Sequence, residues 1–102
     1  MNLGVFDRLI LLNILPKEGD FTTLKIVRKL REDLSFTEAE HKALQFVQEE
    51  GNVKWQSEAD KLTEIAIGEK AMDIIKDVLK KLDKDKKLSE QHYNIYEKFV
   101  ES

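Results

Sequence analysis

The sequence has no cysteine, one proline and only two histidines among its 102 residues. Without cysteine the chain cannot form a disulfide, use a thiol nucleophile or bind a metal through thiolates. This absence suits a reducing compartment, so we expect a cytoplasmic protein. The four glycines stand isolated along the chain, which excludes a glycine-rich loop that cradles phosphate.

Few side chains are available for catalysis. The histidines are His41 and His92, and four serines offer little material for a hydrolytic triad. Glu38 and His41 have the i,i+3 spacing of di-iron carboxylate helices, but such a site needs a second copy of the motif and two more glutamates. No second copy occurs. We therefore expect no enzyme, no catalytic, cofactor-binding or metal-binding residue, and no small-molecule substrate.

Long apolar runs are also missing. The run from Leu9 to Leu15 is too short to span a bilayer. No basic segment precedes it and no small-residue cleavage site follows it, so it does not resemble a signal peptide. The net charge of −3 divides into −2 for residues 1–51 and −1 for residues 52–102. Neither half is a basic arm or an acidic tail, and we expect no membrane partner.

With 41% hydrophobic and 36% charged residues, the sequence is typical of one folded domain, which we expect to span residues 1–102. Apolar residues recur at helical spacing in five segments. Asn2, Asp20, Thr37 and Ser89 are suitable N-cap residues for four of them, and Thr37 with Glu40 forms a capping box. The predicted helices cover residues 2–15, 20–34, 38–43 and 68–83 and a last segment from 89 onward.

The helix predicted over residues 68–83 has the broadest apolar face, so we expect the rest of the chain to pack around it. Between the third and fourth helices the apolar period changes to two, which predicts a β-hairpin with its turn at 49–52. Residues 62–67 form a candidate third strand. The prediction is an α+β fold of about five helices with a small two- or three-stranded antiparallel sheet. We expect Phe46, Trp55, Ile65 and Ile67 to form its inner face and to pack on Ile75, Val78 and Leu79.

The order of three helices and a hairpin resembles a winged-helix DNA-binding domain. The helix before the hairpin and the hairpin itself carry four glutamates against two lysines, and carboxylates oppose contact with phosphate. The clustered cations Lys25, Arg28 and Lys29 lie on the preceding helix instead. A winged-helix transcriptional regulator using those three residues is therefore the alternative function, and nucleic acid is an unlikely partner.

Three strings resemble a family of small uncharacterised proteins carried by tailed phages and prophages. They are Leu11 to Phe21 (LLNILPKEGDF), Leu34 to His41 (LSFTEAEH) and Lys87 to Phe99 (KLSEQHYNIYEKF). The resemblance implies a bacterial host cytoplasm. It implies no activity, and it assigns no role to any residue.

The chain carries more apolar side chain than catalysis requires, which favours a non-enzymatic protein–protein interaction module. The resemblance implies that this module is a phage- or prophage-type accessory protein. The first helix is apolar nearly all round, so we expect residues 3–15 to contribute to a homodimer. In the last helix His92, Tyr93, Tyr96 and Phe99 offer aromatic side chains of the kind that anchor interfaces. These four residues are the predicted partner-binding site.

Overall fold

The computed structural model describes residues 1–101; residue 102, the last of the predicted domain, and the side chains of residues 52 and 57 lie outside the description. Five α-helices and two small antiparallel sheets confirm the predicted α+β class. The helices are α1 (Val5–Ile14), α2 (Phe21–Leu34), α3 (Glu38–Leu44), α4 (Glu69–Lys84) and α5 (Tyr93–Tyr96). The strands are β1 (Asn2–Leu3), β2 (Val47–Glu49), β3 (Asn52–Lys54) and β4 (Thr63–Glu64).

Two predicted helix starts are confirmed at α2 and α3. The Asp20 carboxylate accepts a hydrogen bond from the Thr23 amide at 2.7 Å, and its hydrogen bonds with Thr23 hold the pKa of Asp20 below its ordinary value. The Thr37 hydroxyl accepts from the Glu40 amide at 3.1 Å, and the Glu40 carboxylate accepts from the Thr37 amide at 3.0 Å. Each cap satisfies amides that the first turn of a helix leaves without a partner.

The predicted start of the first helix is wrong. Asn2 is not its cap, because Asn2–Leu3 pairs with Thr63–Glu64 as a short antiparallel sheet. The N-terminal ammonium donates to the Glu64 carboxylate at 2.9 Å and to the Ile65 carbonyl at 3.0 Å. The Ile65 amide in turn donates to the Met1 carbonyl at 2.9 Å. This pairing spans more than 60 residues of chain, so a local cap signal could not reveal it.

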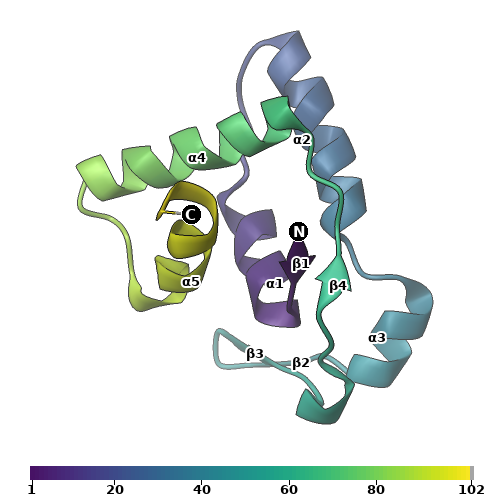
Figure 1. Ribbon diagram of the computed structural model, residues 1–102. Coiled ribbons are helices and arrows are strands. Elements are labelled where there is room, and N and C mark those ends of the chain that lie inside the picture. Colours follow the sequence, from purple (N-terminus) through teal and green to yellow (C-terminus); the bar gives the residue numbers. More distant parts are fainter. Residues whose placement is uncertain (102) are drawn as a thin grey trace.

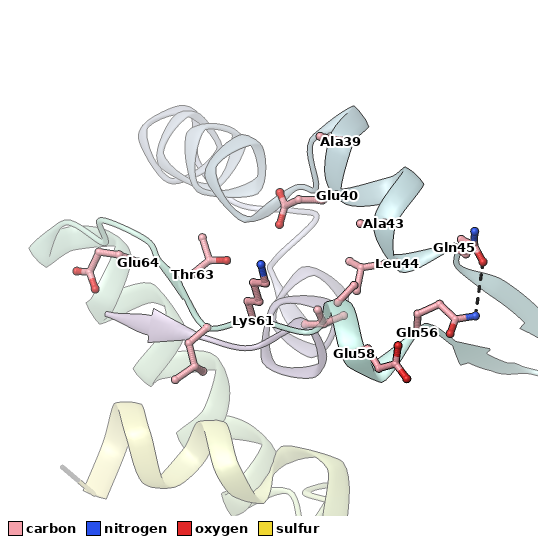
Figure 2. A pocket seen from close by; sticks show the side chains of 13 residues that line it. Ala39, Glu40, Ala43, Leu44, Gln45, Gln56, Glu58, Lys61, Thr63 and Glu64 are labelled. Carbon is pink, nitrogen blue, oxygen red and sulfur yellow. Dashed lines mark hydrogen bonds between the residues drawn. The ribbon is translucent and has the colours of Figure 1, made fainter.

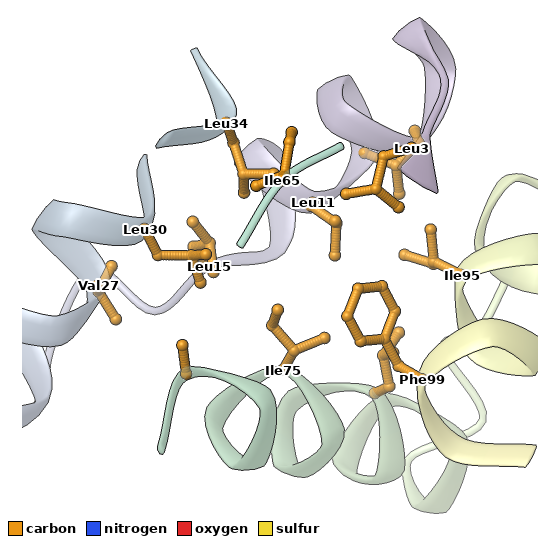
Figure 3. Packing of buried hydrophobic residues seen from close by; sticks show 13 residues of the cluster. Leu3, Leu11, Leu15, Val27, Leu30, Leu34, Ile65, Ile75, Ile95 and Phe99 are labelled. Carbon is orange, nitrogen blue, oxygen red and sulfur yellow. The ribbon is translucent and has the colours of Figure 1, made fainter. Parts of the chain in front are cut away.

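The core lies between α1, α2, α4 and the C-terminal helix (Figure 3). Leu11, Leu30, Ile75 and Phe99 point into the same space from these four elements. Ile65 continues the core from the end of β4. Elsewhere on α1, the buried Asp7 carboxylate accepts a hydrogen bond from the Lys98 ammonium at 2.7 Å, which ties α1 to the C-terminal helix.

The predicted central helix exists as α4 and crosses one end of the molecule (Figure 1). Its buried stripe is narrower than predicted. Ala71, Ile75 and Leu79 are buried, whereas Val78 and Leu82 are only half-buried and lie outside the core cluster. The chain therefore packs on one face of α4, which contacts α2 and the C-terminal helix.

The C-terminal helix is irregular. A 3-10 turn, Glu90–His92, leads into α5, which continues as a π-helical turn, Glu97–Glu101. Ser89 stands before its first turn, as predicted, and its amide donates to His92 Nδ1 at 3.0 Å. Ile95 and Phe99 bury the apolar face of this helix in the core.

Residues 35–64, which we call the peripheral segment, stand apart from this core. None of their described side chains belongs to the core cluster, and Leu44 is the one that is buried. The segment contains α3, the β2–β3 hairpin, a 3-10 turn at Ser57–Ala59 and β4. Figure 1 places α3 and the hairpin at the end of the molecule opposite α4.

The hairpin is confirmed, although its first strand begins later than predicted, at Val47, because α3 runs through Leu44. Glu50 and Gly51 form a two-residue turn with φ values of 43° and 82°, and positive φ at both positions is what a type I′ hairpin turn requires. The hairpin does not join β4, so the predicted common sheet face is wrong. Ile65 and Ile67 pack with Ile75 and Leu79 in the core, whereas Phe46 and Trp55 pack elsewhere.

Candidate functional site

A buried arginine connects the peripheral segment to the core. Arg8, on α1, is 2% exposed. Its Nε donates to the Leu34 carbonyl at 3.1 Å and its Nη2 to the Ser35 carbonyl at 2.7 Å. Both carbonyls lie at the C-terminal end of α2, where helix carbonyls lack partners within the helix. The Arg8 fork thereby fixes α1 against the end of α2.

The same guanidinium holds α3. Arg8 Nη1 donates to Glu40 Oε2 at 2.6 Å, and Nη2 donates to Oε1 at 3.3 Å. The Arg8 hydrogen bond is the largest cause that lowers the pKa of Glu40 to about 2. Because Glu40 also closes the capping box with Thr37, one carboxylate joins the cap of α3 to the buried cation. A buried charge with this many paired partners is one that a protein interior tolerates.

Next to the Arg8–Glu40 pair lie five aromatic rings in mutual contact, which we call the aromatic row. The Arg8 guanidinium lies 4.0 Å from the centre of the Phe36 ring, in cation–π geometry. Ring-to-ring contacts then run in sequence with centroids 5.1 to 6.4 Å apart. The members are Phe6, Phe36, His41, Phe46 and Trp55. They come from α1, α3 and the segments next to α3 and the hairpin, and none is fully buried.

The register of the hairpin assigns its residues to two faces. Gln48 pairs with Val53 and Val47 pairs with Lys54. Directly opposed residues share a face and neighbours alternate, so Val53 lies on the same face as Trp55, whereas Val47 lies on the other. Val53 is 41% exposed and Val47 is 48% exposed. Val53 therefore extends the apolar surface of the aromatic row, while Val47 provides an equally exposed reference on the opposite side.

Trp55 is held in place by a second contact. Its indole N–H donates to Asp60 Oδ2 at 3.2 Å, and Asp60 Oδ1 accepts from the Val5 amide at 3.2 Å. Asp60 thus couples the loop after the hairpin to the first turn of α1. The Trp55 ring is preorganised rather than free to rotate, which lowers the entropy lost when a partner covers it.

The peripheral segment is also the acidic part of the chain. It contains seven carboxylates and three lysines, a net charge of −4, whereas the remaining residues together carry +1. The net charges of the two halves of the sequence, −2 and −1, are nearly equal and do not reveal that the negative charge is concentrated in residues 35–64. The aromatic row therefore lies in a negative field, and a cationic partner approaches it more readily than an anionic one.

A groove of about 1000 Å³ lies between α3 and β4 (Figure 2). On the α3 side, Ala39 and Ala43 are exposed and the buried Leu44 forms the floor. Leu62 also lines the groove and is 69% exposed. The charged lining includes Glu58, Lys61 and Glu64.

The predicted partner-binding residues of the last helix do not form one surface. Phe99 is 1% exposed and belongs to the core, and His92 is buried with its Nδ1 satisfied by Ser89. Only Tyr93 and Tyr96 remain accessible. Tyr96 donates to Asp83 Oδ2 at 3.3 Å, and burial together with the Asp83 charge raises the pKa of its phenol. The two tyrosines line a smaller hollow of about 460 Å³.

The cations of the alternative prediction lie on the exposed side of α2. Lys25, Arg28 and Lys29 are all exposed, and the Lys29 ammonium lies 3.3 Å from the Asp33 carboxylate. None of the three belongs to α3 or to the hairpin, the elements that contact DNA in a winged-helix domain. In the described residues the hairpin is a separate two-stranded sheet.

The helix expected to contribute to a homodimer is covered mostly by its own chain. Of the apolar side chains in residues 3–15, five are buried, three are half-buried and only Phe6 is exposed. Phe6 is therefore the one fully exposed apolar side chain of this stretch, and the homodimer stays a prediction. Phe6 joins the aromatic row through Trp55.

Both side chains of the Glu38–His41 motif contact other residues. Glu38 pairs with Lys42 at 3.8 Å, and His41 packs on Phe36 and Phe46. Among residues 1–101, no group of three or more potential metal ligands comes together. Within the same residues, no helix combines the length and the apolar character needed to cross a membrane.

Comparison with known proteins adds no assignment. The chain matches no protein-family model, no curated protein and no solved structure. Sequence reasoning missed Arg8, Phe6 and Phe36 as parts of a site. One signal was present: the one arginine of a mostly apolar helix must either face solvent or find buried partners.

Proposed function

We propose that the chain is a non-enzymatic protein-binding module that contacts a basic partner through the aromatic row and Val53. The observation that carries this proposal is the combination of a partly exposed row of rigid aromatic rings with the acidic part of the chain. Aromatic residues are enriched where proteins meet. These rings do not belong to the core cluster, and Phe6 and His41 are exposed.

The architecture supports a binding surface better than a catalytic one. The one strongly perturbed acid in the described part of this region, Glu40, is committed to Arg8 and to the cap of α3. It has a structural role and a low pKa, whereas a general acid or base needs a pKa near neutrality. The phage-type accessory role and the bacterial cytoplasm implied by the family resemblance belong to this same proposal.

The two valines of the hairpin provide a matched test. Val53→Ser and Val47→Ser remove the same apolar groups from the same hairpin, at nearly equal exposure and on opposite faces. The immobilised chain is used to capture proteins from a bacterial lysate, and retained proteins are quantified by mass spectrometry. We expect Val53→Ser to lower the retention of a basic protein by about fivefold and Val47→Ser to leave it unchanged, about 1 kcal/mol of differential binding.

Other outcomes identify other surfaces. Equal retention by the two variants contradicts the proposed face. Loss of retention in Tyr93→Ala alone transfers the interface to the two tyrosines near the C-terminus. If nuclease treatment and the Lys25→Ala substitution each abolish the retention of bacterial proteins, the result favours the DNA-binding regulator instead. Lys25 belongs to the basic cluster of α2 that would neutralise phosphates.

A further inference from the structure

We propose that the groove between α3 and β4 receives an extended, lysine- or arginine-rich segment of the partner, which adds to the free edge of β4. This inference depends on the protein-binding function proposed above and specifies what the partner presents. It involves a different element, since the groove is lined by α3, β4 and the loop between residues 56 and 62, whereas the aromatic row follows the hairpin.

The free edge follows from the hydrogen-bonding pattern of the N-terminal sheet. Met1 and Ile65 exchange both of their backbone hydrogen bonds, at 3.0 and 2.9 Å. In an antiparallel pair such residues alternate with residues whose backbone groups point outward. Asn2 opposes Glu64, so the Glu64 N–H and C=O point away from β1. Figure 2 shows Thr63 and Glu64 at the rim of the groove, across from α3.

An unpaired strand edge is a template for another strand. Recognition by strand addition obtains affinity from backbone hydrogen bonds and specificity from pockets for alternate side chains. Here the opposite wall carries the small exposed side chains Ala39 and Ala43, which leave room for a backbone beside β4. The exposed Leu62 and the floor at Leu44 provide apolar contacts for every second side chain of the segment.

Charge selects the chemistry of that segment. Three carboxylates and one lysine line the groove. Glu40 and Glu64 already pair with Arg8 and the N-terminal ammonium, two cations outside the peripheral segment, so a net charge of −2 remains there and the attraction comes from this field rather than from one new ion pair. Complementary fields of this kind govern association rate and partner choice more than final affinity. Nucleic acid is disfavoured by the same field.

The test uses the full chain labelled with ¹⁵N and a synthetic probe, acetyl-Lys-Val-Lys-Val-Lys-Val-Lys-amide. Amide shifts are followed during titration, and hydrogen exchange is measured in the complex. We expect the largest shifts at Leu62, Glu64 and Ala43, together with slower exchange of the Glu64 amide. The same peptide with glutamate in place of lysine should bind at least about tenfold more weakly.

Two N-methylated isomers of the probe test strand addition itself. One carries N-methyl groups on its three valines and the other on the first three of its four lysines. In an added strand every second amide faces β4, so one isomer should lose about tenfold in affinity and the other should bind as the parent does. Equal affinities of the isomers overturn strand addition. On the protein, Glu58→Lys should weaken binding more than the charge-matched Glu49→Lys at the hairpin.

The remaining outcomes separate this inference from the function on which it depends. Shifts confined to the aromatic row, or no shift at about 1 mM peptide, overturn the groove assignment even if the Val53 variant shows that the chain binds proteins. Concentration-dependent shifts at Glu64 without peptide overturn it in favour of a second copy of the chain. Shifts at Glu64 combined with equal capture by the two valine variants support the groove and reject the hairpin face.

Discussion

The helical core and the peripheral segment differ in how each is held together. Leu11, Leu34, Ile75 and Ile95 in the core have no exposed surface, whereas the described side chains of residues 35–64 include one buried leucine and a row of partly exposed rings. Aliphatic burial stabilises the first region. A buried ion pair, a capping box and ring contacts hold the second. The comparison indicates that the peripheral segment is built for presentation of a surface rather than for stability.

Phe99→Ala should have the largest effect, because the ring is 1% exposed at the centre of the core. We expect a loss of about 4 kcal/mol in the free energy of unfolding, in the usual range for deleting a buried aromatic side chain. Urea denaturation followed by circular dichroism measures it. Tyr93→Ala is the control, since it removes an exposed ring from the same helix and should cost less than about 0.5 kcal/mol.

Arg8→Met should cost about 3 kcal/mol, since it leaves Glu40 and two α2 carbonyls without their donor. Hydrogen exchange should show the amides of α3 losing protection before those of α4. Arg8→Lys keeps the charge but not the planar fork, so it should restore only part of the loss. Uniform loss of protection in both helices would mean that the peripheral segment and the core unfold as one unit.

The pH dependence of stability isolates the same pair. The folded pKa of Glu40 is lowered from 4.5 to about 2, so its contribution is fully present above about pH 4.5 and is lost as the pH falls toward 2. Allowing for the partial exposure of this carboxylate, the contribution is roughly 2 kcal/mol. In acid titrations monitored by fluorescence, Glu40→Gln should be less stable at neutral pH and should show a shallower decline over that interval.

Trp55→Ala should cost about 1 to 2 kcal/mol, less than the roughly 3 to 5 kcal/mol typical of a fully buried aromatic. Trp55 is half-buried, stacks on Phe6 and contacts Phe46 edge-on. It does not belong to the core cluster, although the sequence analysis predicted that it packs on α4. Thermal melting provides the measurement. A loss near about 4 kcal/mol would show that the aromatic row and the core are continuous.

The two regions also differ in how well the sequence predicted them. Helical periodicity and caps located α2, α3 and α4 within about one residue, because those signals are local. Apolar residues at every second position, Leu44 and Phe46 before the turn and Val53 and Trp55 after it, predicted a hairpin but not the elements against which it packs. Which sheet Ile65 joined depended on the N-terminal ammonium and Met1, more than 60 residues away.

The site was harder to predict than the fold for a related reason. Phe6 and Phe36 belong to segments whose patterns are helical or loop-like, and only the third dimension brings them beside Phe46 and Trp55. Conversely, Phe99 and Tyr93 were both predicted to bind a partner, yet Phe99 lies in the core and Tyr93 is exposed.

Gly51→Ala should have the smallest effect and separates the two regions most directly. Gly51 has a φ of 82°, and a β-carbon added there would meet nothing within 4 Å, so the cost is backbone strain alone, about 1 kcal/mol. Because the hairpin lies outside the core, we expect its amides to exchange about fivefold faster while the amides of α4 are unchanged. Gly19→Ala is the control, as its backbone lies outside the left-handed region and its new methyl group would make an ordinary contact with Thr23. Equal acceleration in the hairpin and in α4 would mean that the turn stabilises the whole chain, and the distinction between a stable core and a presented surface would fail.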